Sequence, residues 1–392
     1  MRRFNAGFLF AIVLIMLVNV SPTVAQRGKL KQLIEKFDED GDGRLSLSER
    51  AAARKFIQEL AGAKKSETIP PKLIPGKAKL YKLEQGPYKY GVVETFDLEV
   101  PARKKTLPLR ITYPLEQKEY PLIVWCHGAM GSKDGNQPLV EYWVSHGYVV
   151  IQPTFGDSIS LMTEDEKKKV KSIISLVNSP RVISQWDDRP QDVSHLLDSL
   201  GLLEEKIPAL KGKIDHKSLG IAGHSFGAHT TMMICGMKLF NPFTGKPASY
   251  ADDRFMAAVM ISPQGLTKSV TKDSYAQMKI PSLMITGDND GSPMKGKENK
   301  TGAWRKTAFD LVPAGDKYLL WVKDAYHGFG GISGKKSFAG SGPTSEDQVS
   351  IVKSTALAFF DAYLKQKKSA REYLHSSQLE KETGGAGEIS RR

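Results

Sequence analysis

The stretch Gly223-His224-Ser225-Phe226-Gly227 decides the fold, because it has the form G-x-S-x-G. Residues 218–222 before it form a short apolar run of strand length, and residues 228–237 after it are small and apolar, as suits a helix. A strand, a sharp turn and a helix are the context of a nucleophile elbow, in which the turn exposes the serine hydroxyl. Glycines flank the serine there because the two backbones approach too closely for Cβ atoms. A chance match is the alternative, but this context favours Ser225 as a nucleophile.

Apolar runs of strand length recur on both sides of this stretch and alternate with segments of helical periodicity. The alternation indicates an α/β fold, a mostly parallel β-sheet covered by helices on both faces. We expect strands at 88–100, 107–113, 121–126, 148–152, 218–222, 255–262, 280–286 and 318–323, the first two antiparallel, and helices at 135–146, 193–203, 228–237 and 349–364. Residues 155–189 are charged and irregular, which suggests an insertion over the site, and Pro190 stands where the next helix could begin.

A serine acts as a nucleophile at neutral pH only with a histidine that takes its proton and an acid that orients the histidine. In this type of fold the serine, the acid and the histidine follow one another along the chain, each after a strand. Asp288 and Asp290 follow the expected strand 280–286. We favour Asp290, because it closes a G-x-x-D pattern ahead of a proline; Asp288 is the alternative, and the one that is not the acid should stiffen the turn. Of the eight histidines, His327 comes after these residues and directly after a strand, so we predict that it is the base.

Ester hydrolysis also requires hydrogen-bond donors for the oxyanion of the tetrahedral intermediate. The backbone N–H of Phe226, directly after the serine, is the first expected donor. The second should come from His127-Gly128-Ala129-Met130-Gly131, an H-G-x-x-G variant that follows strand 121–126. We assign this role to the Ala129 N–H, with Met130 as the second choice, and expect His127 to hold the turn rather than to move protons.

The segment 88–374 resembles the α/β-hydrolase superfamily, above all its dienelactone-hydrolase-like and platelet-activating-factor-acetylhydrolase-like esterases, and at a greater distance polyester-degrading cutinases. The resemblance rests on His127-Gly128, Trp186-Asp187-Asp188-Arg189 with Asp192, the G-x-S-x-G stretch and His327-Gly328-Phe329. It implies that Ser225 and His327 are catalytic and that Phe226 and Ala129 bind the oxyanion. Dienelactone hydrolases use a cysteine nucleophile, so a serine implies ordinary esters as substrates. Acetylhydrolase-type enzymes take their acid from an earlier strand, but residues 262–265 contain no carboxylate, which leaves the 288–290 pair.

A second motif lies near the amino terminus. Residues 38–49 match a twelve-residue EF-hand loop, with oxygen ligands at positions 1, 3 and 5, glycine at position 6 and glutamate at position 12. An acidic turn between two helices is the alternative reading. The pattern predicts a structural or regulatory Ca²⁺ site of modest affinity, and no cofactor is expected for catalysis. Its ligands would be Asp38, Asp40, Asp42, the backbone carbonyl of Arg44, and Glu49.

Composition divides the chain into five segments. Residues 1–25 have a positive start, an apolar stretch and a small-residue ending, which predicts a secretory signal peptide rather than a membrane anchor. The protein is therefore expected to be secreted or periplasmic, without a stable membrane span. The other segments are an EF-hand module at 28–63, a linker at 64–80, an α/β-hydrolase catalytic domain at 81–374 and a polar, disordered tail at 375–392.

The chain is basic, with a formal net charge of +13, and about +11 without residues 1–25, which remove only Arg2 and Arg3. No nucleic-acid motif is present, so we do not expect the protein to bind nucleic acid. We attribute the positive charge to a solvated, lysine-rich surface, and contact with anionic surfaces is the alternative. Four basic residues follow the acid loop: Lys295, Lys297, Lys300 and Arg305. We expect them to form a solvated helix face; the alternative is that they favour an anionic substrate. The two cysteines, Cys126 and Cys235, should be buried and unpaired.

These observations predict a serine carboxylester hydrolase that acts on a small-molecule or polymeric ester through an acyl-enzyme. A peptidase or an acyltransferase on the same residues is the alternative, because the fold hosts all three reactions. A non-catalytic, calcium-dependent binding protein is a third hypothesis, motivated by the EF-hand loop and the basic charge. The complete set of catalytic residue types argues against that third hypothesis.

Overall fold

The structure, a computed structural model, describes residue 38 and residues 79–392, apart from gaps at 170–178, 242–243, 292–300 and 335–341. By internal contacts the chain divides into two units, residues 1–69 and 70–392. The predicted signal peptide, the EF-hand module except Asp38, and most of the linker lie outside the described residues. Within the described segments, no helix combines the length and the apolar character that a membrane crossing requires.

The second unit is built on a nine-stranded sheet, counted over the described residues, in the order β1-β2-β4-β3-β5-β8-β9-β10-β11. The strands are β1 (Tyr90–Val100), β2 (Lys105–Pro114), β3 (Tyr120–Cys126), β4 (Val149–Pro153), β5 (Ile214–His224), β8 (Phe255–Ile261), β9 (Ser282–Asn289), β10 (Lys317–Tyr326) and β11 (Gly387–Arg391). The six strands from β4 to β10 in this order are parallel, whereas β1, β2 and β11 pair antiparallel at the two sides. The expectation of a mostly parallel sheet with an antiparallel start is therefore confirmed.

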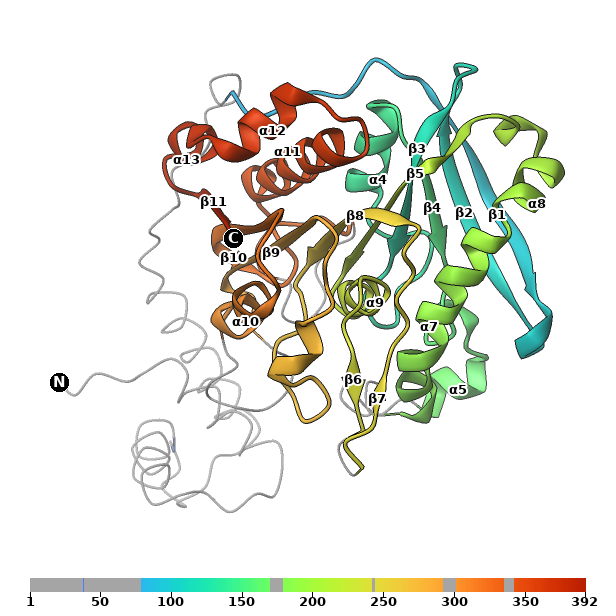
Figure 1. Ribbon diagram of the computed structural model, residues 1–392. Helices are drawn as coiled ribbons and strands as arrows, with labels where there is room; N and C mark the ends of the chain where they lie inside the picture. The colour runs from blue at the N-terminus through green and yellow to red at the C-terminus, as the bar shows by residue number, and fades with distance from the viewer. Residues whose placement is uncertain (1–37, 39–78, 170–178, 242–243, 292–300, 335–341) are drawn as a thin grey trace. The chain divides into compact units, whose positions relative to one another are not determined.

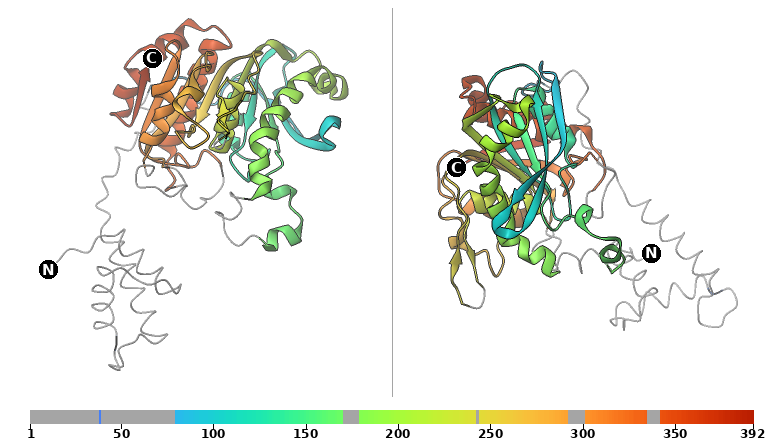
Figure 2. Two further views of the ribbon diagram at one scale, coloured as in Figure 1. Left: turned by 60° about the horizontal axis from the view of Figure 1, so that its bottom comes forward. Right: turned by 90° about the vertical axis from the view of Figure 1, so that its right-hand side faces the viewer.

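Helices cover both faces of the sheet (Figures 1 and 2). Helices α4 (Gln137–Ser145), α11 (Glu346–Tyr363) and α12 (Lys368–His375) pack on one face, and α7 (Pro180–Asp198), α8 (Leu200–Lys206), α9 (Phe226–Ile234) and α10 (Ala303–Leu311) pack on the other. The smaller elements are α5 (Glu164–Lys169), α13 (Gln378–Thr383) and the two-stranded ribbon of β6 (Leu239–Phe240) and β7 (Pro247–Ala248). Because helices shield both faces, the parallel strands can be apolar throughout, and every residue of β3 is buried.

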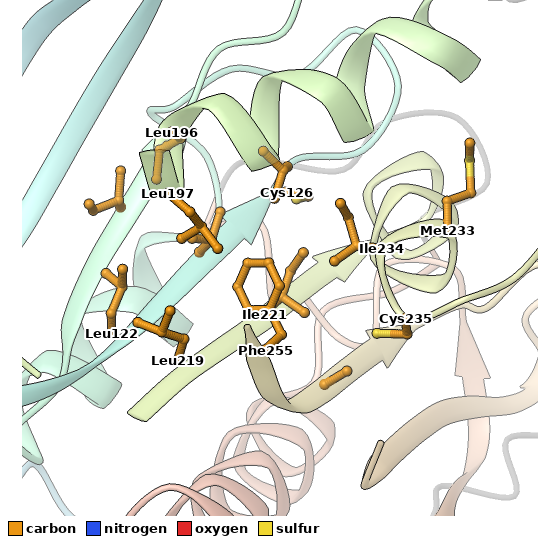
Figure 3. Close-up of a cluster of buried hydrophobic side chains, with 14 of the residues drawn as sticks. Leu122, Cys126, Leu196, Leu197, Leu219, Ile221, Met233, Ile234, Cys235 and Phe255 are labelled. Atoms are coloured by element: carbon orange, nitrogen blue, oxygen red, sulfur yellow. The ribbon is translucent and has the colours of Figure 1, made fainter. Parts of the chain in front are cut away.

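Two hydrophobic clusters hold the layers together, one on each face of the sheet. Figure 3 shows part of the first, where side chains of α7 and α9 meet those of β3, β5 and β8. Cys126 and Cys235 both belong to this cluster, and both are free thiols. The prediction that they are buried, unpaired apolar residues is confirmed.

The helix before the elbow differs from the one predicted. It begins at Pro180, not at Pro190, which lies inside α7. Pro180 stands at the first helical turn, where a missing N–H costs nothing, so the signal that we assigned to Pro190 belongs to Pro180. Part of the expected insertion at 155–189 is therefore regular helix, and it carries Arg189.

The expectation of a disordered tail at 375–392 is wrong. Residues 378–383 form α13, and β11 extends the sheet by pairing antiparallel with β10 from Tyr318 to Val322. Strand pairing uses backbone groups, so a polar segment can join a sheet edge without an apolar pattern in its sequence. Leu379 anchors the segment, because its side chain is buried in the second hydrophobic cluster.

Candidate active site

Ser225 stands between β5 and α9 in a backbone conformation that L-residues rarely adopt, with φ of 58° and ψ of −116°. The flanking glycines permit it, because a Cβ on Gly227 would lie 1.9 Å from the carbonyl oxygen of Cys126 on β3. A Cβ on Gly223 would lie 2.3 Å from the backbone of Gly227 itself. The turn has the close packing and the strain that are typical of functional sites.

The three predicted residues meet at the carboxyl ends of the parallel strands. The Nε2 atom of His327, which follows β10, lies 2.9 Å from Ser225 Oγ. On the other side of the ring, His327 Nδ1 lies 2.7 Å from Asp290 Oδ1, in the loop after β9. Because the carboxylate can only accept, Nδ1 carries the proton and Nε2 presents its lone pair to the serine.

Asp290 is fully buried, and donors surround its carboxylate. Oδ2 accepts hydrogen bonds from Ser262 Oγ at 2.7 Å and from Thr286 Oγ1 at 3.0 Å. Oδ1 also lies 2.9 Å from Nε of Arg305 on α10. Burial alone would raise the pKa of Asp290, but the Arg305 charge and the hydrogen bond with His327 lower it to about 2. Asp290 is therefore ionised at neutral pH.

Asp288 has a different role from Asp290. Its Oδ2 accepts from the backbone N–H of Asp324 at 2.7 Å, and its Oδ1 accepts from Trp321 Nε1 at 2.9 Å. Asp324 has a positive φ of 55°, so the carboxylate holds an unusual turn just ahead of His327. Asp288 thus ties the loop after β9 to the end of β10, whereas Asp290 contacts the histidine.

The predicted oxyanion loop lies against Ser225, because a Cβ built on Gly128 would come within 3.6 Å of the Ser225 Cβ. The Met130 N–H donates to Asp157 Oδ2 at 2.8 Å, so this donor is already used. Among the described residues no acceptor faces the Ala129 N–H. Phe226 is the first residue of α9, where the helix itself supplies no acceptor for the N–H. Ala129 and Phe226 are therefore the donors that a bound oxyanion could use.

A buried ion pair that the sequence did not predict lies beneath this loop. Arg189 on α7 and Asp157 are both fully buried, with Arg189 Nη2 2.7 Å from Asp157 Oδ1. Arg189 Nη1 also donates to the His127 carbonyl at 2.7 Å, and its guanidinium stacks on the rings of Phe155 and Phe226. The pair therefore contacts both segments that carry the candidate oxyanion donors. In the sequence, Trp186-Asp187-Asp188-Arg189 signals only a family resemblance, and its spacing from Asp157 does not indicate an ion pair.

Two further histidines hold loops around the site. His127 Nδ1 donates to the Gly128 carbonyl at 2.7 Å, while its Nε2 accepts from the Phe155 N–H at 3.0 Å. His224 Nε2 donates to the His327 carbonyl at 2.8 Å. Burial lowers the pKa of each ring to about 3, and Arg189 adds to the effect at His127 as His327 does at His224. Both rings are therefore neutral at pH 7.

Arg305 was expected on a solvated helix face, and this expectation is wrong, because the residue is only 3% exposed. Its helix, α10, turns one side toward the acid loop, and the guanidinium lies behind Asp290. Lys295, Lys297 and Lys300 lie outside the described residues, as do Asp40, Asp42, Arg44 and Glu49 of the predicted calcium site.

Comparison with known proteins gives two family matches within the second unit. A family model for chlorophyllase matches residues 79–241, and one for platelet-activating factor acetylhydrolase, isoform II, matches residues 191–293. The matched segments overlap across Ser225, and together they reach past Asp290. A search of the curated proteins found no match.

Both matched families consist of α/β-hydrolase serine esterases, and the sheet and its helices have the arrangement of that fold. The protein is an α/β-hydrolase-fold enzyme of the serine hydrolase class, a carboxylic ester hydrolase. Within that class, the resemblance to the acetylhydrolase-like esterases that the sequence suggested is confirmed by the second match.

Proposed function

We propose that the enzyme hydrolyses carboxylic esters through a catalytic triad of Ser225, His327 and Asp290. The observation that carries the proposal is the continuous chain of contacts from Ser225 Oγ to His327 Nε2 and from His327 Nδ1 to Asp290 Oδ1. His327 takes the hydroxyl proton as Oγ attacks the ester carbonyl carbon, and Asp290 stabilises the resulting imidazolium. The imidazolium then returns this proton to the departing alcohol, which leaves an acyl group on Ser225.

The N–H groups of Ala129 and Phe226 stabilise the oxyanion that forms when the carbonyl is attacked. Each such donor contributes roughly 3 kcal/mol of transition-state stabilisation in related chemistry. In the second half of the reaction, His327 deprotonates a water molecule, which attacks the acyl carbon. The bond to Oγ breaks, His327 protonates the serine, and the carboxylic acid product leaves.

Replacing the nucleophile tests this proposal. Ser225→Ala should lower the rate of hydrolysis of short p-nitrophenyl esters by about 10⁵-fold or more, because no acyl-enzyme can form. The variant should keep the thermal unfolding temperature of the parent, since alanine removes one hydroxyl. A folded Ser225→Ala enzyme with unchanged turnover would exclude the proposed nucleophile.

We further propose that the enzyme is exported, being secreted or periplasmic, and that residues 38–49 bind Ca²⁺ in a structural or docking role. The complete loop pattern supports the calcium site, and its ligands are remote in sequence from the triad. In the full chain, Asp38→Ala with Glu49→Gln should abolish calcium binding measured by calorimetry and leave kcat within about twofold. Loss of esterase activity in this double variant would instead give calcium a catalytic role.

A further inference from the structure

Two buried side chains of opposite charge stand behind the loop that carries the Ala129 N–H. Asp157 follows β4, Arg189 lies on α7, and both are fully buried. Arg189 Nε lies 3.0 Å from Asp157 Oδ1, and its Nη2 lies 2.7 Å from each of the two carboxylate oxygens. Because the two charges compensate each other with good geometry, the pair can stay buried and still offer contacts to the loop.

Arg189 holds the backbone on one side of Ala129. Its Nη1 donates to the His127 carbonyl oxygen at 2.7 Å, and its Nη2 lies 3.3 Å from the Gly128 carbonyl oxygen. The Gly128 oxygen also accepts from His127 Nδ1 at 2.7 Å and from the Gly131 N–H at 3.1 Å. The Gly128 carbonyl and the Ala129 N–H belong to one planar trans peptide, so they point in opposite directions. A carbonyl held toward Arg189 therefore turns the Ala129 N–H away from the ion pair.

Asp157 holds the loop on the other side of Ala129. Its Oδ2 accepts from the Met130 N–H at 2.8 Å, and Met130 has a positive φ of 64°. A residue other than glycine keeps this conformation only where its surroundings hold it. The same hydrogen bond occupies the Met130 N–H, which leaves the Ala129 N–H as the donor that this loop offers.

The segment that carries the second expected donor contacts the same pair. Cζ of Arg189 lies 4.3 Å from the centroid of the Phe226 ring, and the Phe226 N–H is that second donor. Helix α7, which carries Arg189, also packs against α9, which begins at Phe226. One ion pair thus contacts both segments, so a shift of the pair would change the spacing of the two N–H groups.

We propose that the Asp157–Arg189 pair is a positioning element that sets the spacing of the two oxyanion donors. It acts on the stabilisation of the transition state and leaves the affinity for the ground-state substrate unchanged. The inference rests on the proposed ester hydrolysis and deepens it by naming the groups that shape its oxyanion site. Neither side chain of the pair touches the substrate or the reacting atoms in this account.

The test removes the pair without leaving an unpaired charge in the interior. Loss of one partner of a buried pair is strongly destabilising, whereas replacement of both by apolar residues is often neutral for stability. The test variant in the full chain is therefore Asp157→Leu with Arg189→Met. Arg189→Lys is a milder variant, because it keeps the charge and loses the fork of donors. Asp192→Asn is the control, because Asp192 is a buried acid on the same helix whose charged partners are Arg103 and Lys105, not groups of the oxyanion loop.

Two inhibitors with the same acyl chain separate the transition state from the ground state. A trifluoromethyl ketone forms a tetrahedral adduct with the serine, and the oxygen of this adduct occupies the oxyanion site. The matching methyl ketone binds as the free ketone and reports ground-state affinity. Both inhibition constants are measured beside kcat for a p-nitrophenyl ester. Circular dichroism and thermal unfolding establish which variants are folded, and titration with a fluorophosphonate gives the active fraction.

In the folded double variant, kcat should fall about 100-fold, because the loss of one oxyanion donor has an effect of about that size. The inhibition constant of the trifluoromethyl ketone should rise by a similar factor, while that of the methyl ketone stays within about threefold of the parent. Arg189→Lys should lower kcat by about tenfold with the same selective effect on the trifluoromethyl ketone. Asp192→Asn should leave kcat and both inhibition constants within about threefold.

A folded double variant with kcat within about threefold of the parent would overturn the inference. An equal rise of both inhibition constants would overturn it too, because the pair would then support substrate binding as a whole. If the double variant does not fold, the same two criteria are applied to Arg189→Lys. If Ser225→Ala retains activity, the proposed function itself fails, whatever the variants of the ion pair show.

Discussion

The backbone strain at Ser225 and the four donors around Asp290 show how single residues define this site. The serine is held at a positive φ by packing that admits only glycine at position 227. The Asp290 carboxylate is contacted by donors from the residue that follows β8, from β9, from α10 and from the loop after β10. Each residue is thus fixed by elements that are distant in the sequence, which keeps the hydroxyl and the imidazole aligned before substrate arrives.

The two carboxylates of the acid loop give a matched pair of variants. Asp290→Asn should lower kcat by about 10⁴-fold, because an amide cannot stabilise the imidazolium or hold its tautomer. Asp288→Asn should keep kcat within about tenfold and mainly lower the thermal unfolding temperature, because it weakens the bond to the Asp324 N–H. Steady-state kinetics on a p-nitrophenyl ester and thermal unfolding measure both effects. Equal losses of kcat in the two variants would contradict the assignment of Asp290.

Chain order and local pattern were enough to select Ser225, Asp290 and His327, which the structure brings within hydrogen-bond distance. Chain order and local pattern could not predict that Arg305 is buried, because a basic residue on a short amphipathic helix is expected to face solvent. Its burial depends on how α10 packs against the acid loop, which is a tertiary property. The same holds for Arg189 and Asp157, which are paired across 32 positions of the chain.

At the level of elements, the elbow depends on how closely α9 approaches β3. Gly227→Ala should lower the free energy of unfolding by about 3 kcal/mol or more, because the added Cβ would meet the Cys126 carbonyl oxygen at 1.9 Å. Gly201→Ala on α8 is the control, because the structure shows no described atom within 4 Å of its added Cβ. That change should leave stability unchanged or raise it by up to about 1 kcal/mol.

Urea denaturation of the two glycine variants measures these differences. A Gly227→Ala enzyme as stable as the parent would mean that the elbow can relax in a way that the structure does not indicate. A large decrease in the free energy of unfolding of Gly201→Ala would show that the surface of α8 is more constrained than its open surroundings suggest.

Element boundaries show where local sequence signals mislead. Pro190 has the features of a helix start, yet it lies inside α7, which begins at Pro180. Two prolines ten residues apart give the same local signal, and only the packing of α7 against α9 and β1 decides between them. The parallel strands were easier to predict, because burial on both faces makes them continuously apolar.

At the scale of the whole molecule, several buried histidines make stability depend on pH. Burial lowers the pKa values of His127, His224 and His229 to about 3 and that of His146 to about 4. Below about pH 6.5 these residues gain protons on unfolding, so the folded state loses stability as the pH falls from about 6.5 toward 3. Each histidine contributes up to ~1.4 kcal/mol per pH unit to this loss.

Urea denaturation at pH values between 7.5 and 5 should therefore show a free energy of unfolding that decreases below about pH 6.5. His229→Leu should make the decrease shallower, since one of the protons that unfolding takes up in the parent is no longer taken up. His229 suits this test because neither ring nitrogen has a hydrogen-bond partner among the described residues. If the free energy of unfolding of His229→Leu decreases with falling pH as steeply as that of the parent, His229 does not contribute to the pH dependence of stability.

The carboxyl-terminal segment shows why whole-chain organisation was harder to predict than the site. Residues 376–392 are polar and glycine-rich, which favours disorder in isolation. They are ordered because β10 offers an unpaired edge to β11 and because Leu379 enters the second hydrophobic cluster. His375, at the end of α12 just before this segment, forms a 2.8 Å hydrogen bond with the Tyr318 hydroxyl.

The central claim is that Ser225 is an activated nucleophile within an ester hydrolase. A fluorophosphonate probe followed by peptide mass spectrometry tests it most directly, because the probe reacts covalently with a serine that has a positioned base. We predict a single adduct on the peptide that contains Gly223–Gly227, located on Ser225, and its absence in His327→Ala. A folded, unlabelled enzyme, or an adduct on another residue, would contradict the account.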